Sequence, residues 1–195
     1  METNIKFYAA DLAAYNNGTL HGVWIDATSD ADDMQDAVDA MLAQSPVPDA
    51  EEWIIHDYDD SLKCISHLGE TSDLLEIANI MESVEELSDD YDDSILPMLI
   101  EWVSERADSI HWKSHLDDAF AGIHNSGEDY AMELLEDTGD LGALPDYLQG
   151  YFDYRAFARD MAIGGEVDFI CTSTGQYMQD HDSMCGRECI VLRNL

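Results

Sequence analysis

The N-terminal part of the chain alternates apolar and polar positions in short runs, a pattern typical of strands. Asn17-Gly18 separates two such runs and is a strong signal for a two-residue hairpin. The next run spaces its apolar residues as a helix does, and two prolines follow it. The expected elements are strands over residues 5–12, 20–26 and 53–58 and a helix over 30–44. This pattern predicts a small sheet with the helix covering one face.

A polar connection at residues 59–70 is a candidate boundary, because the apolar period beyond it changes to 3.6. Four amphipathic helices are expected here, the first two separated by a polar turn over 88–93. Pro97 falls in a first helical turn, where proline is tolerated, and Ser126 with Asp129 resembles a capping box. The residues expected to face inward are, helix by helix, Leu74, Ile77, Ala78, Met81 and Val84; Ile95, Leu99, Trp102 and Val103; Trp112, Leu116, Ala119, Phe120 and Ile123; and Tyr130, Leu134 and Leu135. The pattern predicts a small helical bundle.

The C-terminal part returns to a mixed pattern. A short helix is expected from Asp153, with one apolar face and Gly164-Gly165 as its end. Strands are expected over 167–172 and 188–192. The whole pattern predicts an α+β fold, an elongated chain of three small modules: an antiparallel sheet plus helix at 1–62, a helical bundle at 63–125 and a mixed sheet and helix module at 126–195.

Charge narrows the classes of partner. The chain has 43 acidic and 8 basic residues, a net charge of −35, and the imbalance is spread over all three predicted modules. Such a surface repels nucleic acid and anionic membranes, so neither is expected as a partner. A basic protein surface is favoured instead. A solvated acidic face, an adaptation to high salt and a chaperone-like acidic binder are alternatives that composition leaves open.

Candidate catalytic and metal-binding patterns are weak. His111 and His115 have zinc-compatible spacing, but no glutamate follows His111. The cysteines and histidine at Cys171, His181, Cys185 and Cys189 lack a Cys-x-x-Cys pair. The aspartate clusters lack the glycine of a calcium loop. We therefore predict no catalytic residue, no cofactor and no metal site. An acidic hydrolase dependent on a divalent metal remains the rival hypothesis.

The chain begins without a recognisable secretion signal and has no apolar run of about 18 residues. A cytoplasmic protein with reduced thiols is therefore expected.

The carboxylates also suggest electrostatic mimicry of DNA. Duplex DNA carries about one negative charge per 1.7 Å of axis, so 35 charges match roughly 60 Å of duplex. Charge by itself speaks to partners and solubility more than to fold or function.

Two long runs of sequence make the functional prediction more specific. They are residues 12–26, LAAYNNGTLHGVWID, and residues 134–148, LLEDTGDLGALPDYL; the second is followed by YFDY at 151–154 and AFARD at 156–160. The chain resembles the ArdA family of antirestriction proteins in these runs, and the second resembles that family's antirestriction motif. The likeness extends to about Phe169, whereas the tail from Ser173 to Leu195 departs from the family's ending.

The resemblance implies a non-enzymatic DNA mimic that inhibits type I restriction–modification enzymes. It implies competition for the DNA-binding groove of the methyltransferase core, which the specificity and modification subunits form. It also implies three modules, a homodimer joined through the C-terminal module and carriage by mobile genetic elements. The expected partner-binding carboxylates are Asp32, Asp33, Asp36, Asp39, Asp59, Asp60, Glu76, Glu82, Glu85, Glu86, Asp89, Asp90, Asp92, Asp93, Glu133, Glu136, Asp137 and Asp140.

The dimer interface is expected in the segment with the densest aromatic content. The candidate residues are Tyr147, Tyr151, Phe152, Arg155 and Arg159. Two alternatives stay open: the aromatic side chains fill the core of their own module, and the two arginines pair with nearby carboxylates.

Overall fold

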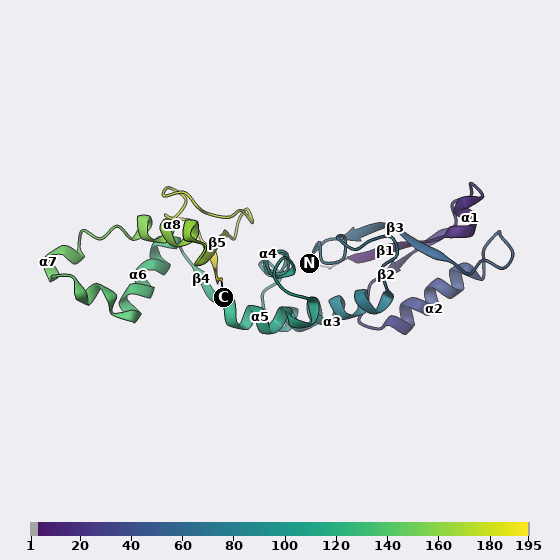
Figure 1. The fold of residues 1–195 in the computed structure, drawn as a ribbon, viewed down its shortest axis with the longest axis horizontal. Helices are drawn as coiled ribbons and strands as arrows, with labels where there is room; N and C mark the ends of the chain where they lie inside the picture. The colour runs from purple at the N-terminus through teal and green to yellow at the C-terminus, as the bar shows by residue number, and fades with distance from the viewer. Residues whose placement is uncertain (1–3, 195) are drawn as a thin grey trace. The chain divides into compact units, whose positions relative to one another are not determined.

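The structure, a computed structural model, describes residues 4–194 (Figure 1). Its contacts divide the chain into two compact units, residues 1–113 and 114–195. The fold is mixed α+β, with one three-stranded antiparallel sheet in each unit, which confirms the predicted class. The division into three modules stays a prediction.

The sheet of the first unit has the strand order β2-β1-β3. Its strands are β1 (Ile5–Asp11), β2 (Gly22–Asp26) and β3 (Trp53–Asp60). Helix α2 (Ala31–Leu42) lies along one face, as Figure 1 shows, and buries Met34, Val38 and Met41. Asp30 accepts hydrogen bonds from the N–H groups of Asp32 and Asp33, which fixes the start of the helix. The predicted strands and helix are confirmed.

The predicted tight hairpin at Asn17-Gly18 is wrong. The connection contains a short helix, α1 (Leu12–Asn16), which Asn17 caps and after which Gly18 turns the chain at φ 75°. The carboxylate of Asp11 accepts the N–H of Ala14 at 3.0 Å and so stabilises the first helical turn. Gly18 therefore adopts its left-handed conformation at the end of a helix rather than in a two-residue turn between strands. Local sequence does not distinguish these two uses of Asn-Gly.

Two helices complete most of the first unit: α3 (Leu74–Asp90) and α4 (Leu96–Ser104). The inward residues predicted for both are buried, and Pro97 lies in the first turn of α4 as expected. The polar turn predicted at 88–93 is shorter, because α3 continues to Asp90 and Tyr91 caps it. The connection at 59–70 is less polar than predicted, since Leu62, Cys64 and Ile65 are buried.

The third helix of the predicted bundle ends early. A short 3-10 turn, η1 (Ser109–His111), leads into α5 (Trp112–Ala119), and the next residues form strand β4 (Phe120–His124). Phe120 and Ile123 are therefore not inward helical residues, and Ile123 is 46% exposed. The physical reason is distant in sequence, because β4 pairs with the C-terminal strand β6 (Cys189–Arg193).

The sheet of the second unit has the order β4-β6-β5, with β5 at Val167–Cys171. Helices α6 (Gly127–Thr138) and α8 (Tyr154–Gly164) contribute to its core. Ser126 accepts the N–H of Asp129, and Gly165 ends α8 at φ 73°, so the predicted cap and helix stop are confirmed. Between the two helices lie η2 (Asp140–Ala143) and α7 (Asp146–Gln149), and Figure 1 shows α7 far from the sheet.

Candidate partner-binding surfaces

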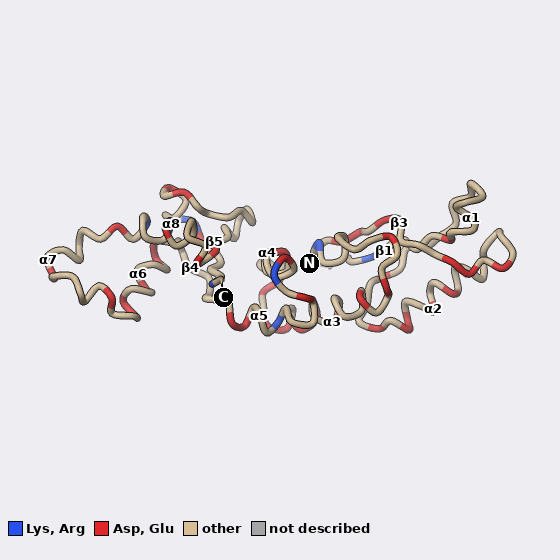
Figure 2. Tube along the Cα trace, in the orientation of Figure 1, with Lys and Arg blue, Asp and Glu red and all other residues tan. Residues whose placement is uncertain are grey.

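Helix α2 separates charge from apolar side chains. Its exposed side carries Asp32, Asp33, Asp36 and Asp39. Three side chains on the opposite side are buried, so the helix is held against the sheet while its carboxylates face water. Acidic positions are visible along this helix in Figure 2.

Helix α3 repeats the arrangement over a longer distance. Its exposed carboxylates are Glu76, Glu82, Glu85, Glu86, Asp89 and Asp90, and Asp92 and Asp93 follow in the turn to α4. The stripe from Leu74 to Leu87 is buried. Acidic positions also run along α3 in Figure 2.

Some of these carboxylates already have partners. Asp60 is half-buried and accepts the N–H groups of Ile65 at 2.7 Å and Ser66 at 2.9 Å, so its role is to hold the loop after β3. Asp59, which is exposed, accepts a hydrogen bond from Asn4. Hydrogen bonds from Ser94 lower the pKa of Asp92. Of these three, Asp60 is the least suited to contact a partner.

Sequence reasoning missed a buried carboxylate at the end of β1. Asp11 is fully buried, and the hydroxyl of Ser45 donates to it at 2.5 Å. Burial raises the pKa of this carboxyl, whereas the hydrogen bonds from Ser45 and Ala14 lower it. The hydrogen bonds outweigh burial, so the pKa lies below its ordinary value. The available signal was an acidic residue directly after the apolar pair Ala9-Ala10.

The basic residues of the first unit do little to interrupt its negative surface. Lys6 pairs with Asp26 at 2.7 Å, Lys63 lies 3.8 Å from Glu101, and Lys113 pairs with Asp90. The guanidinium of Arg106 lies over the ring of Trp102, 4.4 Å from its centre. The first unit has 27 acidic and 4 basic residues, a net charge of −23.

The predicted acidic residues of the second unit lie on α6 and just after it. Glu133, Glu136, Asp137 and Asp140 are all exposed. The carboxylate of Glu133 lies 3.3 Å from Nδ1 of His124. This unit has 16 acidic and 4 basic residues, a net charge of −12.

The three aromatic residues of the predicted dimer interface differ in how far they are exposed. Tyr147 and Tyr151 are 75% and 85% exposed. The ring of Phe152 is half-buried and packs edge-on against Tyr154, with 5.1 Å between ring centres, and against Phe157 at 5.8 Å. The two tyrosines remain candidates for an interface, whereas Phe152 packs within its own unit.

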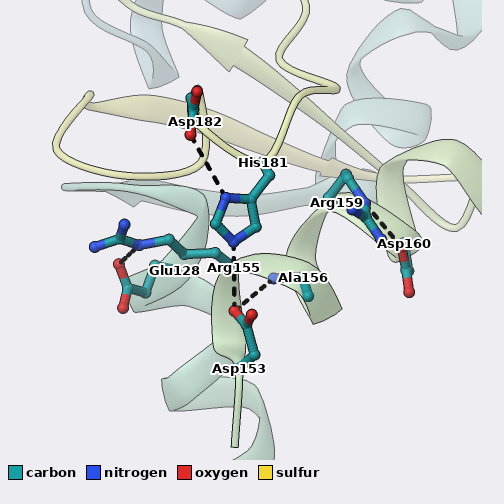
Figure 3. Close-up of polar contacts among 8 residues, drawn as sticks. All are labelled: Glu128, Asp153, Arg155, Ala156, Arg159, Asp160, His181 and Asp182. Atoms are coloured by element: carbon teal, nitrogen blue, oxygen red, sulfur yellow. Dashed lines mark hydrogen bonds and ion pairs between the residues drawn. The ribbon is translucent and has the colours of Figure 1, made fainter.

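Both predicted interface arginines contact carboxylates of their own chain (Figure 3). Nε of Arg155 donates to Glu128 on α6 at 2.7 Å, and Arg159 donates to Asp160 at 2.5 Å. Arg155 therefore ties α8 to α6. Asp153 caps α8 through the N–H of Ala156 and lies 3.6 Å from His181.

The cysteines and histidines do not assemble a metal site in the described part of the chain, where no group of three potential ligands is found. Cys171 and Cys189 lie opposite each other on the neighbouring strands β5 and β6. Hydrogen bonds from Ser173 and Thr174 lower the pKa of Cys171 to about 7, and burial raises that of Cys189 to about 12. Within residues 4–194, no helix combines the length and apolar character needed to span a bilayer.

The arrangement is a set of exposed carboxylates on helices whose opposite sides are buried. A comparison with curated proteins found no match. The family model described as "Antirestriction protein (ArdA)" matches residues 7–176, which include both acidic helices and the exposed tyrosines. The chain therefore belongs to the ArdA family of antirestriction proteins, which act against restriction–modification.

Proposed function

We propose that this protein is a non-catalytic DNA mimic that occupies the DNA-binding groove of type I restriction–modification enzymes. The groove is that of the methyltransferase core, formed by the specificity and modification subunits. No cofactor is required, and the cytoplasm is the compartment in which this partner would be met. The observation that carries the proposal is the exposed carboxylate face of α2 and α3 in a chain of the ArdA family.

The spacing of charge on these helices supports mimicry. A helix rises about 1.5 Å per residue, so the four aspartates from Asp32 to Asp39 span roughly 10 Å. The six carboxylates from Glu76 to Asp90 span roughly 21 Å, a mean spacing of about 4 Å. One strand of duplex DNA carries about one phosphate per 3.4 Å. Each acidic helix thus carries charge at about the density of one DNA strand.

This display needs no precise match to base edges, because phosphate contacts supply most of the sequence-independent affinity for DNA. Carboxylates that take the place of phosphates release the counter-ions of a basic groove. Affinity should therefore fall steeply as salt concentration rises.

A competition titration tests the proposal. Increasing amounts of the protein are added to a type I methyltransferase core bound to a labelled duplex, at low and at physiological salt. Displacement of the duplex at near-stoichiometric protein is expected. Failure to displace it at low salt, with folded protein, would contradict the proposal.

We further propose that the protein acts as a homodimer. Two chains of net charge −35 repel, so the interface must contain apolar surface and few carboxylates. The exposed Tyr147 and Tyr151 support a location in the segment between α6 and α8. Arg155 and Arg159, already paired within the chain, would soften the repulsion without making direct charge pairs across the interface.

A further inference from the structure

Strand β2 is an edge strand with unused backbone groups. Among residues 4–194, the sheet order places β1 on one side of it and no strand on the other. The N–H of Asp11 donates to the carbonyl of His21, and the N–H of Ala27 donates to the carbonyl of Ile5. These two bonds identify which opposite residues of the β1–β2 ladder are hydrogen-bonded to each other. Pairing alternates along an antiparallel ladder, so Val23 and Ile25 bond to β1. The N–H and C=O groups of Gly22, Trp24 and Asp26 therefore point outward.

A groove runs beside this edge. It has a volume of about 360 Å³ and lies between β2 and the adjoining side of α2. Residues of both elements line it, including Val23, Ile25, Ala37, Ala40 and Met41. Nε2 of His21 donates to the carbonyl of Met41 at 2.8 Å and ties the start of β2 to the end of α2. The small alanines leave room for one further side chain.

One end of the groove is acidic. Asp33 and Asp36 precede Ala37 and Ala40 by four residues each, so they lie one helical turn away on the same side of α2. Both carboxylates are exposed. Asp26, at the end of β2, is also exposed and pairs with Lys6. An occupant must therefore bring positive charge to this end.

We propose that this groove binds an extended segment of a basic partner protein. The segment adds as a fourth strand to the outer edge of β2, in the manner of strand addition to exposed sheet edges. It places a small apolar side chain between β2 and α2 and a lysine or arginine beside Asp33 and Asp36. The site goes beyond the DNA-like display because it reads backbone groups and shape as well as charge.

A model peptide tests the site on the full chain. The probe is a capped octapeptide, Lys-Thr-Val-Thr-Val-Thr-Lys-Thr, whose lysines and valines share one face of the strand. Two further forms carry backbone N-methyl groups either on all threonines or on all lysines and valines. All three have the same charge. Binding is followed by amide hydrogen exchange of Gly22, Trp24 and Asp26 and by chemical-shift titration. One N-methylated form should bind like the parent and the other at least about tenfold more weakly, because only one set of N–H groups faces β2. Equal binding of all three forms would mean attraction by charge alone and would overturn the proposal.

Substitutions locate the site. Trp24→Pro removes one outward N–H without touching the ladder to β1 and should weaken peptide binding at least about tenfold. Trp24→Ala is its control, because it removes the ring and keeps the N–H, and should retain binding. Ala40→Leu fills the groove and should also abolish binding, whereas Gln35→Leu, elsewhere on α2, should not. Circular dichroism checks folding, and Ala40→Leu decides the matter if Trp24→Pro does not fold.

A second copy of the chain is the competing occupant. If Trp24→Pro converted a dimer to a monomer in sedimentation experiments without peptide, edge-to-edge self-association would explain the surface and the proposal would fail. Loss of peptide binding without loss of DNA competition would leave the proposed antirestriction function intact. The two proposals can thus fail separately.

Discussion

Helix α2 and the segment at residues 139–153 both lie on the surface, but they differ in how they are supported. α2 buries three side chains and shows four carboxylates to water. No side chain of the segment is buried, although it contains Tyr147, Leu148 and Tyr151. Its backbone is held in part by Gln149, which donates to the carbonyls of Leu141 and Leu144.

The difference indicates two uses of exposed surface. Carboxylates on a helix with a buried opposite side keep their spacing, as a rigid charge display requires. Exposed aromatic side chains without a core of their own gain free energy when another surface covers them. This difference supports the proposal that α2 and α3 display charge and that the segment takes part in assembly.

The sharpest test of this assignment is removal of both tyrosines. Tyr147→Ala with Tyr151→Ala should weaken the dimer by about 2–4 kcal/mol, or roughly 30- to 1,000-fold, because exposed aromatic residues are frequent hot spots. Stability of the folded chain should change by less than about 0.5 kcal/mol, since neither ring is buried. Sedimentation equilibrium and thermal denaturation measure the two quantities. Tyr15→Ala, at an exposed tyrosine of the first unit, is the control. An unchanged dimerisation constant would move the interface elsewhere.

Neutralising a whole face should have the next largest effect. Replacing the four exposed aspartates of α2 by asparagine should reduce competition with DNA by about 10- to 100-fold, because each exposed contact contributes a modest amount. Neutralising Glu133, Glu136, Asp137 and Asp140 should also reduce it, and the losses should accumulate. A complete loss from one set with none from the other would favour a discrete site, as the metal-dependent hydrolase hypothesis requires. Competition titrations over a range of salt concentrations distinguish these cases.

Asp11 contrasts with the displayed carboxylates, because its role is structural. Asp11→Asn should lower the free energy of unfolding by about 1–3 kcal/mol by disturbing buried hydrogen bonds. Since the folded-state pKa is lowered, the stabilisation is complete above the unfolded-state value of about 3.9 and is lost as pH falls through the folded value. Urea denaturation of wild type and variant should therefore converge in strong acid. A gap that persisted there would contradict the role of ionised Asp11, and Asp36→Asn is the matched exposed control.

Single changes on the display should have the smallest effect. Asp32→Asn, Asp36→Asn or Glu86→Gln should each alter competition by less than about threefold, because neighbouring charges lie within a Debye length. The same titration measures this. Abolition of activity by one such change in a folded protein would reject a distributed surface.

Local sequence predicted those features that depend on neighbours in the chain. The stripe of α3, the cap at Ser126 and the stop at Gly165 each follow from residues within one or two turns. The runs at 12–26 and 134–148 carried the family resemblance, and the family match from 7 to 176 confirms it. The accessible carboxylates followed from the same periodicity, because a helix with one apolar face must place its charges on the other.

Tertiary structure decided what depends on distant partners. Residues 120–124 are a strand because β6 pairs with them, and β6 lies beyond the matched residues, in the tail that departs from the family's ending. Asp60 and Asp92 lie in acidic stretches of sequence that are typical of a charged surface. Each nevertheless accepts backbone hydrogen bonds that give it a structural role. The outward edge of β2 and the groove beside it exist only once α2 lies against the sheet. Sequence spacing sets which side chains share a face, but the packing of one element against another determines which of those faces remain open.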